Sequence, residues 1–430
     1  MRRIPFVPLK GVDNVELFYD LIFVYLISVI TSLLHHPHNG FIDPSVYISY
    51  ILSFMTVLQI WFFTTLLMNR YGTKSASDYV CLFINMFLLY FMASGISDHW
   101  ESTIFTFDIS WALILVNLLF HWGYKLFRFE GIDSRDRLII GRTMGALATQ
   151  LIIVLAAAFS PAYIASWLSL AAVAVGMLLW TQGKVFSLKA PRFAHLTERC
   201  ALLVIVTFGE TIVAISAYMT TTATITYPIL VFALVVGLFL IYTYEYDHML
   251  DHHHKSNGMT YMMVHAWIVI VLGNLTLGLE FMTNSEFDFL PKNIFLTVFL
   301  VLYLLTSFML TRYNKPEYHY SYPYVVGRII VCVLIVVVAI VSSFNPTITL
   351  TCDVIAIYLA LGHEMFLFRG RNRIIEYVHS RGLSHEELEE QGFTFTTREG
   401  RRAIREAMRD TLSTHHIDES DMPDDEDDEK

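Results

Sequence analysis

Long apolar stretches recur along the whole chain, and they constrain its fold more than any other feature. A helix rises about 1.5 Å per residue and a bilayer core is about 30 Å thick, so a transmembrane helix needs roughly 20 apolar residues. Of the 430 residues, 55% are hydrophobic and 16% are charged, which is too apolar for one water-soluble core. Twelve stretches qualify as spans: 15–34, 46–68, 79–96, 107–126, 138–159, 162–181, 200–219, 227–246, 259–279, 294–310, 324–343 and 348–368. The sequence therefore predicts an all-α polytopic transmembrane helix bundle of about 12 spans, with the lipid bilayer as its main partner.

The basic residues between these stretches alternate, as the positive-inside rule requires of a correct span count. Lys and Arg gather before the first stretch and after the even-numbered ones, and Lys292 is the one basic residue assigned to the other side. The inner set comprises Arg2, Arg3, Lys10, Arg70, Lys74, Lys125, Arg128, Arg135, Arg137, Lys184, Lys189, Arg192, Arg199, Lys255, Arg312 and Lys315. We therefore expect a multi-pass protein of the cell membrane with both termini in the cytosol.

The composition changes after residue 369, which separates a transmembrane domain, 1–369, from a charged tail. A capping-box pattern from Ser384 to Glu387 and the stretch 399–412 predict short amphipathic helices in a cytosolic segment, 370–417. The acidic end, 418–430, is expected to be disordered. Much of the formal charge of −10 lies in this end, and it indicates no nucleic-acid partner.

Two of the stretches resemble each other weakly. Phe18, Asp20 and Ile22 in the first stretch recur in order as Phe208, Glu210 and Ile212 in the seventh. A duplication into parallel halves, 1–182 and 183–369, would explain the pattern, and chance agreement at three positions is the alternative.

Several ionisable residues fall inside the apolar stretches, where a charge is costly unless protein or water shelters it. Glu16 and Asp20 are four residues apart and share one face of the first predicted helix. Glu210 is about ten residues into the seventh stretch and is expected near the bilayer midplane, with Glu198 and Arg199 at the start of the same helix. These residues are candidates for coupling an ion to transport. A headgroup contact for Glu16 and a purely structural hydrogen bond for Glu210 are the alternatives.

Further candidates lie in the ninth and last stretches and near inner helix ends. They are His265, Glu280, Asp353, His363, Glu364, Arg142 and Arg328. Arg142 and Arg328 are the natural counter-charges for Asp20, Glu210 or Glu364. Gly141 and Gly145 form a small-xxx-small pattern, which favours close helix approach.

A polar cluster follows the eighth stretch and reads YTYEYDHMLDHHH, residues 242–254. Asp247 with Asp251, and His248 with His252, have the i, i+4 spacing that lets two side chains on a helix share one metal ion. A solvated, histidine-rich loop is the alternative interpretation.

Motifs for soluble-type catalysis do not occur in the sequence. It contains no phosphate-binding glycine loop, no nucleophile elbow, no HExxH and no zinc-type cysteine pairs. The four cysteines, Cys81, Cys200, Cys332 and Cys352, all lie in apolar stretches and are typical of small buried residues. We expect neither an enzyme nor a bound cofactor.

Two segments together resemble a known family. ELFYDLIFV, residues 16–24, and ERCALLVIVTFGETIVAIS, residues 198–216, are similar to the signature segments of the low-temperature-requirement A (LtrA) family of bacterial membrane proteins. The segments IYTYEYD, 241–247, and LGNLTLGLE, 272–280, extend the resemblance. The resemblance implies a multipass membrane protein associated by name with growth at low temperature, and it singles out Glu16, Asp20, Glu198, Arg199, Gly209, Glu210, His265 and Glu280.

These observations favour a proton- or cation-coupled secondary transporter of a small solute, with Glu210 as the coupling group and Asp20 as its partner. A membrane stress sensor or scaffold that signals through the cytosolic tail is a second hypothesis. An intramembrane metal-dependent enzyme that uses the cluster at residues 247–252 is a third.

Overall fold

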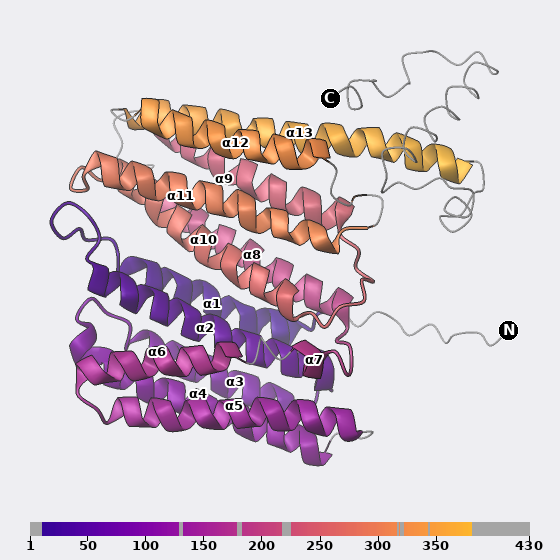
Figure 1. The fold of residues 1–430 in the computed structure, drawn as a ribbon. Helices are drawn as coiled ribbons and strands as arrows, with labels where there is room; N and C mark the ends of the chain where they lie inside the picture. The colour runs from indigo at the N-terminus through magenta and orange to yellow at the C-terminus, as the bar shows by residue number, and fades with distance from the viewer. Residues whose placement is uncertain are drawn as a thin grey trace. The chain divides into compact units, whose positions relative to one another are not determined.

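Figure 1 shows the computed structural model of the chain, which describes residues 11–128, 132–178, 183–216, 225–315, 318, 322–342 and 345–380. Within these residues the secondary structure is helical, apart from isolated β-bridges. The helices group into two compact units. Unit 1 is the described part of Met1–Pro228 and His252–Thr306, and unit 2 is the described part of Ile229–Asp251 and Ser307–Lys430.

Each predicted stretch coincides with a helix. Unit 1 contains α1 (Asn14–Ser32), α2 (Pro44–Tyr71), α3 (Ala76–Ala93), α4 (Trp100–Arg128), α5 (Ser134–Ala158), α6 (Ala162–Leu178), α7 (Gly183–Phe186), α8 (Phe193–Ser216), α10 (Met259–Thr283) and most of α11 (Phe289–Phe308). Unit 2 contains most of α9 (Thr226–Tyr244), the π-helix η2 (Glu245–Met249), the 3-10 helix η3 (Met309–Tyr313), α12 (Tyr322–Val341) and α13 (Pro346–Ser380).

The predicted helical membrane architecture is confirmed. Among the described helices, eleven are long and apolar enough to cross a membrane, and α6 is a shorter apolar helix. The short α7 was not predicted, because four residues carry no detectable hydrophobic period. The helices expected at 384–387 and 399–412 and the disordered end at 418–430 lie outside the described residues. The division into halves at residue 182 stays a prediction, because packing units and sequence repeats are different properties.

Capping residues explain where α2 and α5 begin. Asp43 precedes α2, accepts a hydrogen bond of 2.7 Å from the Ser45 amide and is followed by Pro44 at the first helical position. Asp133 and Asp136 form a capping box at the start of α5.

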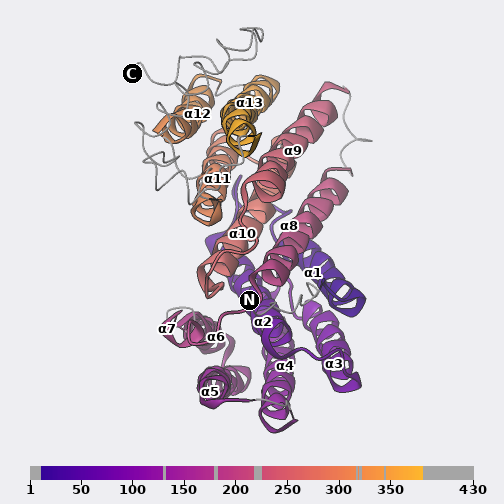
Figure 2. The same ribbon diagram turned by 90° about the vertical axis from the view of Figure 1, so that its right-hand side faces the viewer.

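Helices α2 and α10 are the most enclosed helices of unit 1. Other parts of the protein bury 89% of the apolar span of α2 and 83% of that of α10, but only 33% of that of α5. The polar residues of α2 therefore face other helices instead of lipid. Helix α8 packs against both α1 and α10, and α2 also contacts α1 and α8 (Figure 2).

Basic residues of successive loops meet at one end of unit 1, here called the basic end. Arg70 of α2 donates to the Phe186 carbonyl at 3.1 Å. Lys189 pairs with Asp136 of α5 at 2.6 Å, and Lys125 of α4 pairs with Asp78 of α3 at 2.5 Å. The alternation of basic loops in the sequence thus agrees with the packing of these helices.

Gly141 and Gly145 do not bring another helix close to α5, so the prediction from their small-xxx-small pattern was wrong. A Cβ atom on either glycine would have no neighbour within 4 Å. Gly176 of α6 is instead the close contact, because its Cα faces the side chains of Gln59 and Gln150. The pattern GxxxG reports small residues but not the direction in which they point.

Candidate functional site

A buried ion network joins the first and seventh predicted stretches. The Arg199 guanidinium on α8 donates through Nη1 to Glu16 at 2.9 Å and through Nη2 to Asp20 at 2.6 Å. All three side chains are almost completely inaccessible to solvent. The i, i+4 spacing on α1 places both carboxylates on the face that meets α8, so one planar guanidinium can bridge them. Arg142, which the sequence suggested as a counter-charge for Asp20, is exposed on α5, and Arg199 pairs with Asp20 instead.

His195 completes this network on α8, one turn before Arg199. Its Nε2 lies 3.1 Å from Glu16, while its Nδ1 lies 3.2 Å from the Asn69 amide nitrogen. The Asn69 amide is oriented by Arg192, whose backbone N–H donates to Oδ1 and whose carbonyl accepts from Nδ2. Because Asn69 Nδ2 is a donor, Nδ1 of His195 is the acceptor in this contact, and Nε2 lies close to Glu16 without a hydrogen bond of good geometry. Two carboxylates thus share one guanidinium, and one of them, Glu16, also lies beside an imidazole.

Helix α2 packs against the ion network through Trp61, which contacts both Asp20 and Arg199. The Trp61 indole donates to Asp20 at 2.9 Å, and the Arg199 guanidinium lies 5.9 Å from the centre of the Trp61 ring. Glu16 Oε1 and Asp20 Oδ2 nevertheless have no hydrogen-bond donor. These two oxygens are the places in the network where a proton or a small cation could be accommodated. Glu198 faces a different neighbour and accepts from the Val12 amide at 3.3 Å.

A second acidic group lies at the other end of the same helices. Glu280 of α10 is buried, and its Oε2 lies 3.1 Å from Nε2 of His35, which follows α1. Glu210 of α8 is buried beside them, with Ser28 of α1 as a hydrogen-bonding partner and electrostatic contacts to Glu280 and His35. The structure therefore brings Glu210 and Glu280 together, but it does not bring Glu210 to Asp20.

Glu210 lies deeper along its helix than the sequence indicated. The predicted stretch started at residue 200, whereas α8 starts at Phe193. At about 1.5 Å per residue, Glu210 is about 26 Å from the start of α8 and only about 9 Å from Ser216. The polar residues His195 and Arg199 belong to the helix although they dilute its apolar pattern, so α8 begins about two turns earlier than the predicted stretch.

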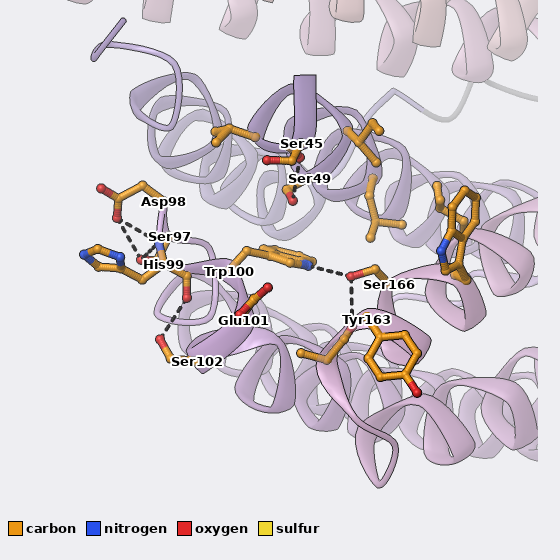
Figure 3. A pocket seen from close by; sticks show the side chains of 16 residues that line it. Ser45, Ser49, Ser97, Asp98, His99, Trp100, Glu101, Ser102, Tyr163 and Ser166 are labelled. Atoms are coloured by element: carbon orange, nitrogen blue, oxygen red, sulfur yellow. Dashed lines mark hydrogen bonds between the residues drawn. The ribbon is translucent and has the colours of Figure 1, made fainter. Parts of the chain in front are cut away.

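Two pockets open at this end of unit 1. The His35 pocket, of about 650 Å³, is lined by residues 32–38, Ile42, Asp43, Ser45, Val46 and 96–98. The Trp100 pocket, of about 690 Å³, shares Ser45, Val46, Ser97 and Asp98 with it and continues along α2, α4 and α6. Figure 3 shows the Trp100 indole directed at Ser166, to which it donates at 3.2 Å, with Glu101 and Tyr163 beside it. None of the predicted site residues lines either pocket, but His35 connects the first pocket to Glu280.

The other predicted residues lie in separate places. His265 is fully buried in α10, where its Nδ1 lies 2.9 Å from the Tyr261 carbonyl and its ring lies 4.3 Å from the Tyr261 ring. In unit 2, Arg328 pairs with Glu364 at 3.2 Å, as one of the predicted counter-charge pairings proposed. Asp353 is buried in α13, and its Oδ2 has no hydrogen-bond donor.

The predicted metal ligands do not share a helix face. Asp247 and His248 belong to η2, which ends at Met249, so Asp251 and His252 follow the helix end instead of its next turn. His252 lies 3.2 Å from the Thr197 hydroxyl in unit 1. Within the described residues, no three His, Cys, Asp or Glu side chains are placed to hold one metal ion.

One buried charge cluster escaped the sequence analysis. Asp78 of α3 lies 2.9 Å from His121 Nε2 and 2.5 Å from Lys125 Nζ, and it also accepts from the Thr73 amide. His121 and Lys125 have an i, i+4 spacing on α4, which is the same signal that drew attention to Glu16 and Asp20. Lys125 was assigned to the basic loop after the fourth stretch and His121 was not singled out, so the burial of the pair was not foreseen.

The fold and these ion pairs define a class: a multi-span helical membrane protein whose charged residues are sheltered between helices. Residues 11–361 match the family described as bacterial low temperature requirement A protein (LtrA), and the chain belongs to this family. Both resembling segments, 16–24 and 198–216, lie within the match, and the Arg199 network joins one to the other. No curated protein matches the sequence.

Proposed function

We propose that this LtrA-family protein is a proton- or cation-coupled secondary transporter of a small solute, and not an enzyme. The observation that supports the proposal is the position of Glu210 and Glu280. They are two buried carboxylates that interact electrostatically with each other, and Glu280 pairs with His35, which lines an open pocket of about 650 Å³. An ion that arrives in this pocket can reach a carboxylate through His35, while the helices α8 and α10 cover the carboxylates from other sides.

The Arg199 network is the second part of the proposal. It lies at the opposite end of α1 and α8, and two of its carboxylate oxygens lack donors. Phe23 and Ile27 of α1 are buried between the two acidic groups along the helix. Alternating access would then expose the Glu210 end and the Arg199 end in turn, with this apolar part of α1 as the barrier between them.

The proposal is tested with purified protein in proteoliposomes that contain a pH-sensitive dye. Candidate amino acids, sugars and other small solutes are added one at a time, and we expect at least one to drive proton movement in the wild type. Sodium and potassium gradients test the same solutes for cation coupling. Glu210→Gln removes the titratable group with little change in shape and should abolish coupled movement while the protein still inserts and purifies.

The matched control is Glu286→Gln, an exposed carboxylate at the same end of unit 1. It should leave the flux unchanged. Equal coupled flux in wild type and Glu210→Gln would reject the part given to Glu210.

A further inference from the structure

Unit 2 contains a buried ion pair that belongs to none of the sites above. Glu364 of α13 accepts from Arg328 Nη2 at 3.2 Å and from the Tyr324 hydroxyl at 3.0 Å, both on α12. Arg328 also donates to the Tyr324 oxygen at 2.9 Å and lies 5.5 Å from the centre of its ring. The two helices approach closely here, because the His363 ring occupies the space that a side chain at Gly327 would need.

A second buried glutamate interacts electrostatically with this pair. Glu245, the first residue of η2, is 2% exposed, and neither of its carboxylate oxygens has a hydrogen-bond donor. Its electrostatic neighbours are Glu364 and Arg328, and the Asn314 amide interacts with it as well. The Asn314 Oδ1 and the Arg328 Nη1 are themselves without partners. Two carboxyl groups therefore share a single guanidinium.

The backbone of η2 holds Glu245 in this position. The Leu250 amide donates to the Glu245 carbonyl at 3.1 Å, which closes the wide turn of the π-helix. The segment after η3 is tied to the end of η2, because the Lys315 amide donates to the Met249 carbonyl at 2.8 Å. Single π-turns of this kind are frequent at functional sites.

Among the residues whose side chains the structure describes, Arg328 is the cation that interacts with Glu245. Tyr244, the last residue of α9, stacks on His248 of η2 at 4.7 Å, and the Lys315 ammonium donates to the His248 carbonyl at 3.1 Å. Arg369 of α13 interacts with Tyr244. The electrostatic partners of Glu245 include Arg328 but neither Lys315 nor Arg369.

The charges in this group balance only with one additional proton. Two ionised carboxylates beside one guanidinium leave one uncompensated negative charge in a buried place, which is strongly unfavourable. A proton on one carboxyl makes the group neutral, and it also provides the O–H donor that the unsatisfied acceptors lack. Close carboxyl pairs that share a site characteristically keep one such proton.

We propose that Glu245 and Glu364 form a proton-binding site in unit 2, in which the two carboxyl groups hold one proton between them and Arg328 balances the remaining charge. The ligand of this site is the proton itself. The site does not depend on the transport function proposed for unit 1, and its test uses no transport measurement.

Infrared spectroscopy of the purified full-length protein tests the proposal. The carbonyl stretch of a protonated carboxylic acid is resolved from that of an ionised carboxylate, and the difference spectrum isolates the groups that a substitution removes. At neutral pH we expect Glu245→Gln to lose about one carboxylic-acid equivalent per chain, because Glu364 then keeps Arg328 and ionises. Glu364→Gln should lose the same amount, because Glu245 then takes the guanidinium. Glu286→Gln should lose none. An unchanged acid band in Glu245→Gln would overturn the proposal.

A labelling experiment on the wild type guards against a folding defect in the variants. A hydrophobic carbodiimide reacts with protonated carboxyl groups in apolar surroundings, and peptide mass spectrometry locates the product. We expect modification of Glu245 or Glu364 at neutral pH, with a yield that falls as the pH is raised. Complete absence of label from both residues, under conditions that label another buried carboxyl of the same sample, would contradict the shared proton.

Discussion

Arg199 lies between two buried carboxylates, and it is the arginine or lysine that the described residues place beside them. Replacing it by alanine would leave Glu16 and Asp20 buried without the guanidinium, and breaking a buried ion pair by removing one partner costs about 3–5 kcal/mol. We expect Arg199→Ala to lower the Tm of the detergent-solubilised protein by a large amount. Arg199→Lys keeps the charge but cannot bridge both carboxylates, and its Tm should fall between those of the wild type and Arg199→Ala.

The control for this prediction is Arg142→Ala. It removes an arginine from a membrane-spanning helix too, but that arginine is exposed on α5. Its Tm should stay near the wild-type value. Equal losses in Arg142→Ala and Arg199→Ala would mean that the measured effect comes from net charge and not from the network.

His35 makes the stability of unit 1 depend on pH. The hydrogen bond to Glu280 raises the pKa of His35 above its ordinary value of 6.5, although burial opposes the rise. The stabilisation by this pair is fully present below about pH 6.5, where the unfolded chain also has a protonated imidazole, and it is lost as the pH rises through the raised pKa. The His35 side chain is 40% exposed, so the contribution should not exceed about 1 kcal/mol.

This prediction is measured as the Tm of the purified protein across a pH series. His35→Gln should remove the part of the decrease that follows the histidine titration, and His36→Gln, at the exposed neighbouring position, should keep it. Parallel Tm curves for wild type and His35→Gln would contradict the prediction.

The residues of the site were largely predictable, but their partners were not. Charge inside an apolar stretch is rare enough to single out Glu16, Asp20, Glu210 and Glu280. The choice of Arg199 as the cation for α1 depends on which helices are neighbours, and hydropathy does not contain that information. Trp61 and Asn69 look like ordinary residues of an apolar helix, and only the packing of α2 against α1 and α8 gives them a part in the network.

At the scale of the element, amide side chains connect three helices of unit 1. Gln59 of α2 donates to the Val173 carbonyl of α6 at 2.6 Å, and Gln150 of α5 donates to Gln59 at 2.9 Å and to the Ala172 carbonyl at 2.8 Å. Gly176 leaves the space that these two amides occupy. An additional methyl group there would displace them, and overpacking of this kind costs about 1–3 kcal/mol.

We therefore expect Gly176→Ala to lower the Tm, measured in the same detergent as the wild type. Gly145→Ala is the matched control, because its new methyl group meets nothing within 4 Å and alanine favours the helix. A larger loss in Gly145→Ala than in Gly176→Ala would show that the amide contacts are not the cause.

The helices themselves could be predicted well, since lipid imposes a minimum length and an apolar composition on each span. Helix ends were predicted less well where polar residues extend a helix, as at His195 and Arg199 in α8. The π-helix that positions Glu245 could not be predicted, because a single wide turn leaves the hydrophobic pattern of α9 unchanged.

At the scale of the whole molecule, charge distribution determines which way the chain faces. The structure gathers Arg70, Lys125 and Lys189 at the basic end of unit 1, and the His35 pocket lies at the other end. Because basic loops are retained in the cytosol, we propose that the basic end and both termini are cytosolic and that the His35 pocket opens to the outside.

Cysteine labelling of intact cells with a membrane-impermeant maleimide checks this orientation. Glu101→Cys and Glu286→Cys, both at exposed positions, should react in intact cells, whereas Lys184→Cys and Glu429→Cys should react only after the membrane is opened. The wild type provides the background, since Cys81 and Cys200 are buried and Cys332 and Cys352 lie within membrane-spanning helices. Reaction of Lys184→Cys in intact cells would invert unit 1 and place the His35 pocket inside. Reaction of Glu429→Cys alone would require an odd number of crossings, which the alternating basic loops argue against.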